Sequence, residues 1–288
     1  RSILLSIVAT LFMNQKLILA ISGMGSLFSP SSSPQVNRIK YLLTRKILIS
    51  FYKLFIPKKR AYFILQNKED YGYIVKNNLA FEKSSFIISG NGLKKSFFFY
   101  DPLPSIQKKI RFIMISRLLK DKGVLEFLKA SHELSLELEG FESMLFGDFD
   151  PANFNSLTPN ELKPFLNTVV QYKGHTRKIR DEIINAAVVV HPSYREGFSK
   201  VLMESQACSR PIITTNVVGC KDVIIPNKTG ILVEPHSYIA VKEAMKEIIA
   251  GGIDLNLFSK RAYEHAVNKF SVELASAKHI EIFRKIQL

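Results

Sequence analysis

The stretch AVVVHPSYREGFSKVLMESQACSRPIITT, residues 187–215, decides the fold class of this chain. Its first residues are a β-branched run that ends at His191, as is typical of a strand covered on both faces. A polar turn follows, then a helical pattern over residues 200–208 and a second β-branched run at 211–214. This order of strand, helix and strand predicts a parallel sheet with crossover helices.

The same alternation extends over most of the chain. Strands are expected at 17–22, 61–66, 86–89, 110–116, 143–146 and 169–171, and helices at 35–55, 68–79, 123–134, 159–166 and 176–185. Three further helices, separated at 251–252 and 270–271, are expected within 237–286, and the proline-containing residues 101–104 predict a linker. We therefore expect an α/β protein with two Rossmann-like domains facing a cleft, and a ligand at the carboxyl ends of the strands.

Composition and charge restrict the classes of function. Of the 288 residues, 47% are hydrophobic and 23% charged, which excludes a disordered tail, a collagen-like repeat and a coiled coil. With 40 Lys and Arg against 25 Asp and Glu, the net charge of +15 indicates an anionic partner: nucleic acid, anionic lipid or a phosphorylated ligand. The two cysteines cannot form a disulfide framework, so a reducing cytosol is the simpler compartment. The apolar runs at 3–13 and 17–21 are too short to span a bilayer and predict an amphipathic helix and a buried strand.

The turn after His191 carries the residues richest in chemistry. Glu196 lies in the turn and Glu204 in the following helix, with seven residues between them. Gly197 permits close approach to the backbone, and the amides at the start of the helix can bind an anion. One carboxylate could then face a sugar while the other reaches a neighbouring hydroxyl. The alternative reading of this spacing is two solvated glutamates beside an ordinary turn.

Residues 196–204 resemble the E-x7-E signature of the retaining GT-B glycosyltransferases of family four, the group 1 glycosyl transferases that use nucleotide-sugar donors. Other segments resemble motifs of that family in the family's order. These are ISGMGSLF (21–28), QNKED (66–70), ISRLLKDKG (115–123), ACSRPIITT (207–215), GCKD (219–222) and NKTGILV (227–233). The resemblance covers nearly the whole chain and says little about the substrate.

The resemblance implies roles on the donor side. Arg117 and Lys122 would hold the donor's diphosphate, where negative charge builds as the glycosidic bond breaks; otherwise they are an exposed pair at a helix start. Glu196 would be the catalytic residue and bind hydroxyls of the transferred sugar, and Glu204 would bind the ribose. His175 would line the base pocket or be a structural histidine. The remaining donor-binding residues would be Gly197, Phe198, Ser199 and Lys200, the last three through their backbone amides.

The resemblance also implies an acceptor side and domain limits. The acceptor-side residues would be Ser22, Gly23 and Asn67, with Ser22 standing where many relatives carry a histidine. The domains would be a partial acceptor-side domain at 1–104, a nucleotide-sugar-binding domain at 105–270 and a helix at 271–288 that packs back on the first. Since no glycine-rich turn precedes Ile3, we expect the N-terminal domain to be incomplete, so that the chain binds nucleotide but turns over poorly or not at all.

Two apparent metal motifs are interpreted otherwise. Asp148 and Asp150 match a D-x-D pattern, but they precede a proline in a loop where the resembled family often has acidic residues. The spacings of His191, Cys208 and Cys220 fit no usual zinc site. We therefore expect no metal and no cofactor.

The basic residues within 35–59, interleaved with aromatic ones, suit a helix that lies on an anionic membrane surface. The alternative is a helix with a solvated basic face. No nucleic-acid-binding signature is visible, so nucleic acid is not expected as a partner. The expected location is cytoplasmic, peripheral on the inner face of the bacterial cytoplasmic membrane.

The implied function is the metal-independent transfer of a hexose or N-acetylhexosamine from a UDP-sugar to a lipid-linked saccharide acceptor, with retention of configuration. Such reactions build capsule, O-antigen of lipopolysaccharide and other surface polysaccharides. Front-face displacement is the expected mechanism. The alternative is a double displacement in which Glu196 is the covalent nucleophile. One alternative is a truncated, inactive remnant that still binds nucleotide or a partner. The other is a different GT-B enzyme, such as a phosphorylase or an epimerase.

Overall fold

The computed structural model describes residues 6–7, 9–10, 14–24, 38–104 and 109–286. The chain divides into two compact units, one made of residues 1–91 with 275–288 and the other of residues 92–274. Both contain a parallel sheet covered by helices, as the alternation in the sequence predicted. Most of the expected helix at 3–13, residues 35–37 of the next helix and the end of the ISGMGSLF segment lie outside the described residues.

The second unit is built on a six-stranded parallel sheet. Its strands are β4 (Ile110–Ile115), β5 (Phe141–Phe146), β6 (Val170–Gly174), β7 (Val188–His191), β8 (Ile212–Thr215) and β9 (Gly230–Val233). The spatial order β6-β5-β4-β7-β8-β9 is that of a Rossmann sheet, in which the chain reverses direction across the sheet between β4 and β7. Strand β9 was not among the expected strands.

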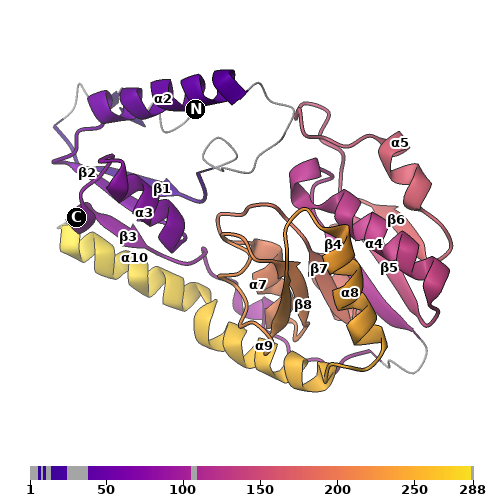
Figure 1. The fold of residues 1–288 in the computed structure, drawn as a ribbon. Coiled ribbons are helices and arrows are strands. Elements are labelled where there is room, and N and C mark those ends of the chain that lie inside the picture. Colours follow the sequence, from indigo (N-terminus) through magenta and orange to yellow (C-terminus); the bar gives the residue numbers. More distant parts are fainter. Residues whose placement is uncertain (1–5, 8, 11–13, 25–37, 105–108, 287–288) are drawn as a thin grey trace. The chain divides into compact units, whose positions relative to one another are not determined.

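Helices cover both faces of this sheet, because alternate residues of its central strands point to opposite sides. Phe112 and Met114 of β4 pack in one core with α4 and α8, whereas Ile113 packs in another with Ile183 of α6. Figure 1 shows α4 and α8 side by side. The helices are α4 (Val124–Glu137), α5 (Pro159–Leu162), α6 (Ile179–Ile184), α7 (Lys200–Ala207), α8 (Tyr238–Ile249) and α9 (Leu255–Lys269), with short 3₁₀ helices η3 (Lys95–Phe97), η4 (Lys120–Lys122) and η5 (Lys163–Phe165).

The first unit has a three-stranded parallel sheet in the order β1-β2-β3. Its elements are β1 (Leu17–Ile21), α2 (Arg38–Phe55), β2 (Ala61–Leu65), α3 (Lys68–Lys76), η2 (Glu82–Ser84) and β3 (Ser85–Ile87). Phe63 and Leu65 of β2 pack in a core with residues of α2 and α3, which therefore lie on one face of the sheet. Among the described residues, no helix combines the length and apolar character needed to cross a bilayer.

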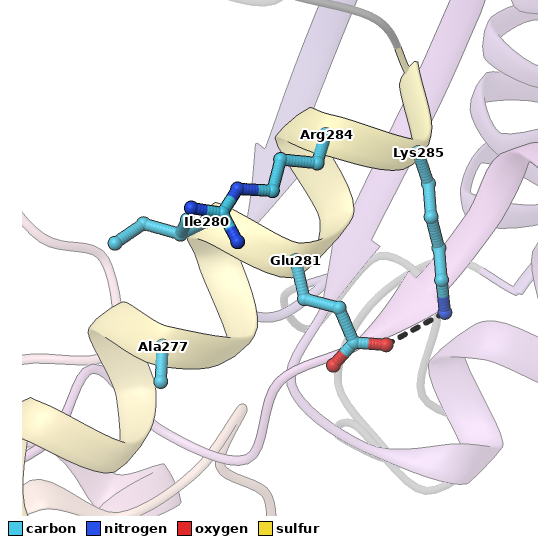
Figure 2. A pocket seen from close by; sticks show the side chains of 5 residues that line it. All are labelled: Ala277, Ile280, Glu281, Arg284 and Lys285. Atoms are coloured by element: carbon cyan, nitrogen blue, oxygen red, sulfur yellow. Dashed lines mark ion pairs between the residues drawn. The ribbon is translucent and has the colours of Figure 1, made fainter.

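The C-terminal helix α10 (Val272–Ile286) covers the opposite face of that sheet. Its Ile282 and Ile286 pack with Ile64 of β2, and Lys16 Nζ donates a 2.6 Å hydrogen bond to the Ile286 carbonyl. The chain thus returns to its first unit at its end. A shallow open pocket lies on the outer side of α10 (Figure 2). Its lining residues are Ala277, Ile280, Glu281, Arg284 and Lys285, and Glu281 and Lys285 form a 2.7 Å ion pair.

Residues 92–104 belong to the second unit, so the division between the units falls at 91/92 and not at the proposed linker. Leu93 and Phe97 pack in the core around α7 and α9. The fully buried Arg210 donates to the carbonyl of Asp101 at 2.9 Å and contacts its carboxylate at 3.3 Å. These contacts attach the proline-containing segment to the second sheet.

Candidate functional site

The candidate site lies where the second sheet changes direction, at the carboxyl ends of β4 and β7. The loop after β4 contains Arg117 and Lys122, and the loop after β7 contains Glu196. Gly123, with φ of +73°, lets the two loops touch, since a Cβ there would lie 2.0 Å from the Pro192 carbonyl oxygen. A larger residue at Gly123 would push the loops apart.

Glu196 is the centre of the charge network in this site. Its Oε1 accepts a hydrogen bond from Lys122 Nζ at 2.6 Å and lies 2.9 Å from His191 Nε2. Only 18% of the Glu196 side chain and 15% of the Lys122 side chain are exposed. Burial alone would raise the pKa of Glu196, but the hydrogen bonds and charges of His191 and Lys122 outweigh it and hold the pKa at about 2. Glu196 is therefore an anion at neutral pH.

A third loop, after β8, fixes the backbone around Glu196. The Glu196 amide donates to the Val218 carbonyl at 3.0 Å, and the Ser199 amide donates to the Gly219 carbonyl at 2.9 Å. Gly219 has φ of +74°, and a Cβ on it would lie 2.4 Å from the Glu196 carbonyl oxygen. In this conformation the Ser199 amide, which the resemblance assigns to the diphosphate, donates to a carbonyl 20 residues further along the chain.

Glu204 lies one turn inside α7, and its side chain is almost completely buried. Its Oε1 is 3.2 Å from Nζ of the exposed Lys200 but makes no aligned hydrogen bond to any described residue. Burial raises the pKa of Glu204, and the charge of Lys200 only partly opposes this. A buried carboxylate oxygen without a donor is costly, so the site favours a ligand that brings hydroxyl groups to it.

The remaining expected donor-side residues lie along the same edge of the sheet. Arg117 is exposed and lies 3.5 Å from Oδ2 of Asp150, and His175 Nδ1 lies 2.7 Å from Oδ2 of Asp148. Both acids of the D-x-D pattern thus have a cationic or imidazole partner. Within the part of the chain that the structure describes, no group of three or more His, Cys, Asp or Glu is arranged to hold a metal ion.

The acceptor-side residues lie in the first unit. Ser22 and Gly23 follow β1 and Asn67 follows β2, so all three are at the carboxyl edge of the same parallel sheet. Asn67 is buried and caps α3: its Oδ1 accepts from the Asp70 amide at 2.7 Å and its Nδ2 donates to the Asp70 carboxylate at 3.0 Å. Asp70 also accepts from the Met24 amide at 3.3 Å, which ties the loop after β1 to α3.

Sequence reasoning missed two residues of this site. His191 was considered only as a metal ligand, yet it contacts Glu196, and its place at the end of a buried strand five residues before Glu196 was an available signal. Gly219 was noted only within a motif, and no local pattern indicates that it packs against Glu196.

Comparison with known proteins gives one family. The profile of the family described as "Glycosyl transferases group 1" matches residues 99–265. The chain is 27% identical over 212 residues to the capsular polysaccharide biosynthesis glycosyltransferase CapM of Staphylococcus aureus, covering 70% of this chain and 51% of CapM. It is 25% identical over 280 residues to the N,N'-diacetylbacillosaminyl-diphospho-undecaprenol alpha-1,3-N-acetylgalactosaminyltransferase of Campylobacter jejuni, covering 92% of this chain and 69% of that protein. The chain thus spans about half the length of the first relative and about two thirds of the second.

Two solved structures have the same fold. A glycosyltransferase from Rickettsia africae superposes with a TM-score of 0.76 at 21% identity, over 98% of this chain and 73% of its own. Anabaena Alr3699/HepE, solved in complex with UDP-glucose, superposes with a TM-score of 0.77 at 15% identity, over 99% of this chain and 76% of its own. The α/β fold with two parallel sheets matches the GT-B glycosyltransferase structures.

Proposed function

This chain belongs to the group 1 glycosyl transferases, and from that membership we propose that it moves a hexose or N-acetylhexosamine from a UDP-sugar to a lipid-linked saccharide. The transfer retains the configuration of the sugar and contributes to the synthesis of a bacterial surface polysaccharide. The observation that carries the proposal is the ionised Glu196 between Lys122 and His191 at the carboxyl edge of the second sheet. The S. aureus and C. jejuni relatives, by their names, act in capsule synthesis and on an undecaprenol-linked acceptor.

The donor's diphosphate is assigned to Arg117, in the loop after β4, and Lys122, the last residue of the short 3₁₀ turn in that loop. Lys122 would exchange its contact with Glu196 for one with a phosphate oxygen, while the exposed Arg117 would leave Asp150 in the same way. The amides of Phe198 and Lys200 remain candidates for further phosphate contacts. A ribose hydroxyl would supply the hydrogen bond that Glu204 Oε1 lacks. HepE, with its UDP-glucose complex, supports a nucleotide of this kind.

The chemical step follows from the charges in this site. The bond between the sugar's anomeric carbon and the diphosphate oxygen breaks, and the acceptor hydroxyl bonds to the same face of that carbon. The acceptor's proton passes to the departing diphosphate oxygen, so no base from the protein is needed. Arg117 and Lys122 stabilise the charge on the leaving group, and the Glu196 carboxylate accepts hydrogen bonds from sugar hydroxyls. We propose that this step needs no metal, since the cationic side chains of Arg117 and Lys122 can supply the positive charge that the leaving diphosphate requires.

The distribution of charge supports an anionic surface as partner of the first unit. That unit has 16 Lys and Arg against 4 Asp and Glu, a net +12, whereas the second has 24 against 21, a net +3. Nearly all of the excess therefore lies outside the unit that holds the donor site. Helix α2 adds exposed apolar side chains at Leu43, Ile47 and Leu54 next to the basic Lys46 and Lys53. This combination favours peripheral binding to an anionic membrane, where a lipid-linked acceptor is located.

Calorimetric titration of the full chain with UDP and with a panel of UDP-glucose, UDP-N-acetylglucosamine and UDP-N-acetylgalactosamine tests the donor assignment. We expect UDP to bind and Arg117→Ala to weaken it by about tenfold, as for one charged hydrogen bond. Lys120→Ala is the matched control, because this cation in the same loop pairs with Glu161 at 3.0 Å. No binding of UDP by the wild-type chain, or equal losses in both variants, would contradict the assignment.

Transfer to an undecaprenyl-diphosphate-linked saccharide tests the activity itself. We expect product with the sugar's original anomeric configuration, and its loss in Glu196→Gln. Nucleotide binding without any transfer would instead favour a remnant that binds nucleotide and does not catalyse.

A further inference from the structure

Among the residues that the structure describes, Glu196 is the one side-chain hydrogen-bond partner of His191. The imidazole is buried at the last position of β7, with Nε2 2.9 Å from Glu196 Oε1. The buried Nδ1 has no hydrogen-bond partner among the described residues. An ionised carboxylate only accepts hydrogen bonds, so the hydrogen of this contact is on Nε2, which donates a hydrogen bond to Glu196 Oε1. A buried histidine that leaves one nitrogen unpaired is expensive to keep as a mere core residue.

The backbone of His191 is held in the sheet, whereas that of Lys122 lies in a short turn. His191 is paired with Thr214 of β8 in the sheet, and the Thr214 hydroxyl donates to the His191 carbonyl at 2.8 Å. Lys122 reaches Glu196 from a short 3₁₀ turn through a flexible four-carbon stem. Of the two donors on Oε1, the lysine is therefore the one that can change partner at small cost.

We propose that His191 is the positioning residue of the donor site, which holds Oε1 of Glu196 in place when Lys122 turns to the donor's diphosphate. This inference rests on the proposed function. Both donors share one carboxylate oxygen, so Oε2 of Glu196 is the atom that receives sugar hydroxyls. With His191 in place, the departure of Lys122 does not free the carboxylate to rotate. The group that recognises the sugar then stays oriented while the group that binds the phosphates moves.

The loss of His191 should affect the binding of the sugar and not the binding of the nucleotide. Glu196 is assigned to the sugar, so the loss of its support weakens the binding of a UDP-sugar and leaves that of UDP almost unchanged. A histidine with a purely structural role would affect both ligands together. The ratio of the UDP affinity to the UDP-sugar affinity therefore separates the two roles.

Two variants of His191 make the test specific. His191→Gln keeps an N–H donor near the position of Nε2, whereas His191→Leu removes it and fills the space. The probes are UDP and whichever of UDP-glucose, UDP-N-acetylglucosamine and UDP-N-acetylgalactosamine binds the wild-type chain most tightly. We expect the Leu variant to lose about tenfold in UDP-sugar affinity relative to UDP, as for one hydrogen bond to a charged group. The Gln variant should recover most of this loss.

A double-mutant cycle with Glu196→Gln shows whether His191 acts through Glu196. In the Glu196→Gln background, His191→Leu should change the affinity ratio less than twofold. A Leu variant that keeps the wild-type ratio, or an equal effect in both backgrounds, would overturn the inference while UDP binding still supports the proposed function. If the wild-type chain binds neither UDP nor a UDP-sugar, the proposed function fails and this inference fails with it.

Discussion

The strongest electrostatic prediction concerns the acid stability conferred by Glu196. The pKa of Glu196 falls from the ordinary 4.5 to about 2 in the folded chain, where Lys122 and His191 contact its Oε1. The unfolded chain therefore takes up this proton first as the pH falls. The stabilisation is complete above the unfolded pKa and is lost as the pH falls through the folded one. The two values make the ionisation of Glu196 worth about 3 kcal/mol of unfolding free energy at neutral pH.

Glu196→Gln is the perturbation, because the amide keeps an acceptor oxygen but cannot ionise. Between pH 5 and pH 3, we expect the wild-type unfolding free energy to fall by about 2 kcal/mol more than that of the variant. Urea denaturation of both chains across this range measures the difference, provided that the m-values agree. Glu137→Gln is the matched control, since this carboxylate lies exposed on α4 and solvent screens its ion pair. Equal pH slopes for the wild type and Glu196→Gln would refute the reasoning.

Three further predictions test other parts of the structure. Gly219→Ala should lower the unfolding free energy by about 2 kcal/mol and weaken UDP-sugar binding, because its Cβ would lie 2.4 Å from the Glu196 carbonyl at a φ of +74°; unchanged thermal melting would contradict this. Arg210→Met removes the buried hydrogen bonds to residues 101, 184 and 208 and should cost about 3–5 kcal/mol, seen as a clear fall in Tm. Leu54→Glu on α2 should weaken sedimentation with phosphatidylglycerol vesicles several-fold. Leu136→Glu is the matched control and should have no such effect, because Leu136 is about equally exposed (74% against 76%) but lies in the second unit. Equal losses in the two leucine variants would point to a general effect of charge.

Most of the sheet could be predicted from the sequence, because its strands are short β-branched runs separated by helical patterns. Strand β9 was missed because its run begins at Gly230 and is partly exposed, so it lacks the continuous buried β-branched pattern of β7 and β8. The domain boundary was misplaced because Pro102 and Pro104 read as a linker. Only the fold reveals that Arg210, more than 100 residues later, holds Asp101 against the second sheet.

The candidate site shows the same limit. The loops that carry Arg117, Lys122 and Glu196 were predicted to lie at strand ends, and they do. The contact between Lys122 and Glu196 joins residues 74 positions apart, so no local spacing indicates that the cation is held by the carboxylate before any donor binds. The cap formed by Asn67 could have been predicted, since Asn followed three residues later by Asp is a common helix-start pattern.

The contacts of Gly123 and Gly219 limit how this site can be re-engineered. A side chain at Gly123 would begin where the Pro192 carbonyl oxygen lies, and one at Gly219 would begin where the Glu196 carbonyl oxygen lies. The three loops therefore pack against one another through their main chains. A library randomised at either glycine should yield mostly misfolded clones. Diversity introduced at the exposed Arg117 would instead change how tightly the diphosphate is bound, in a scaffold that still folds.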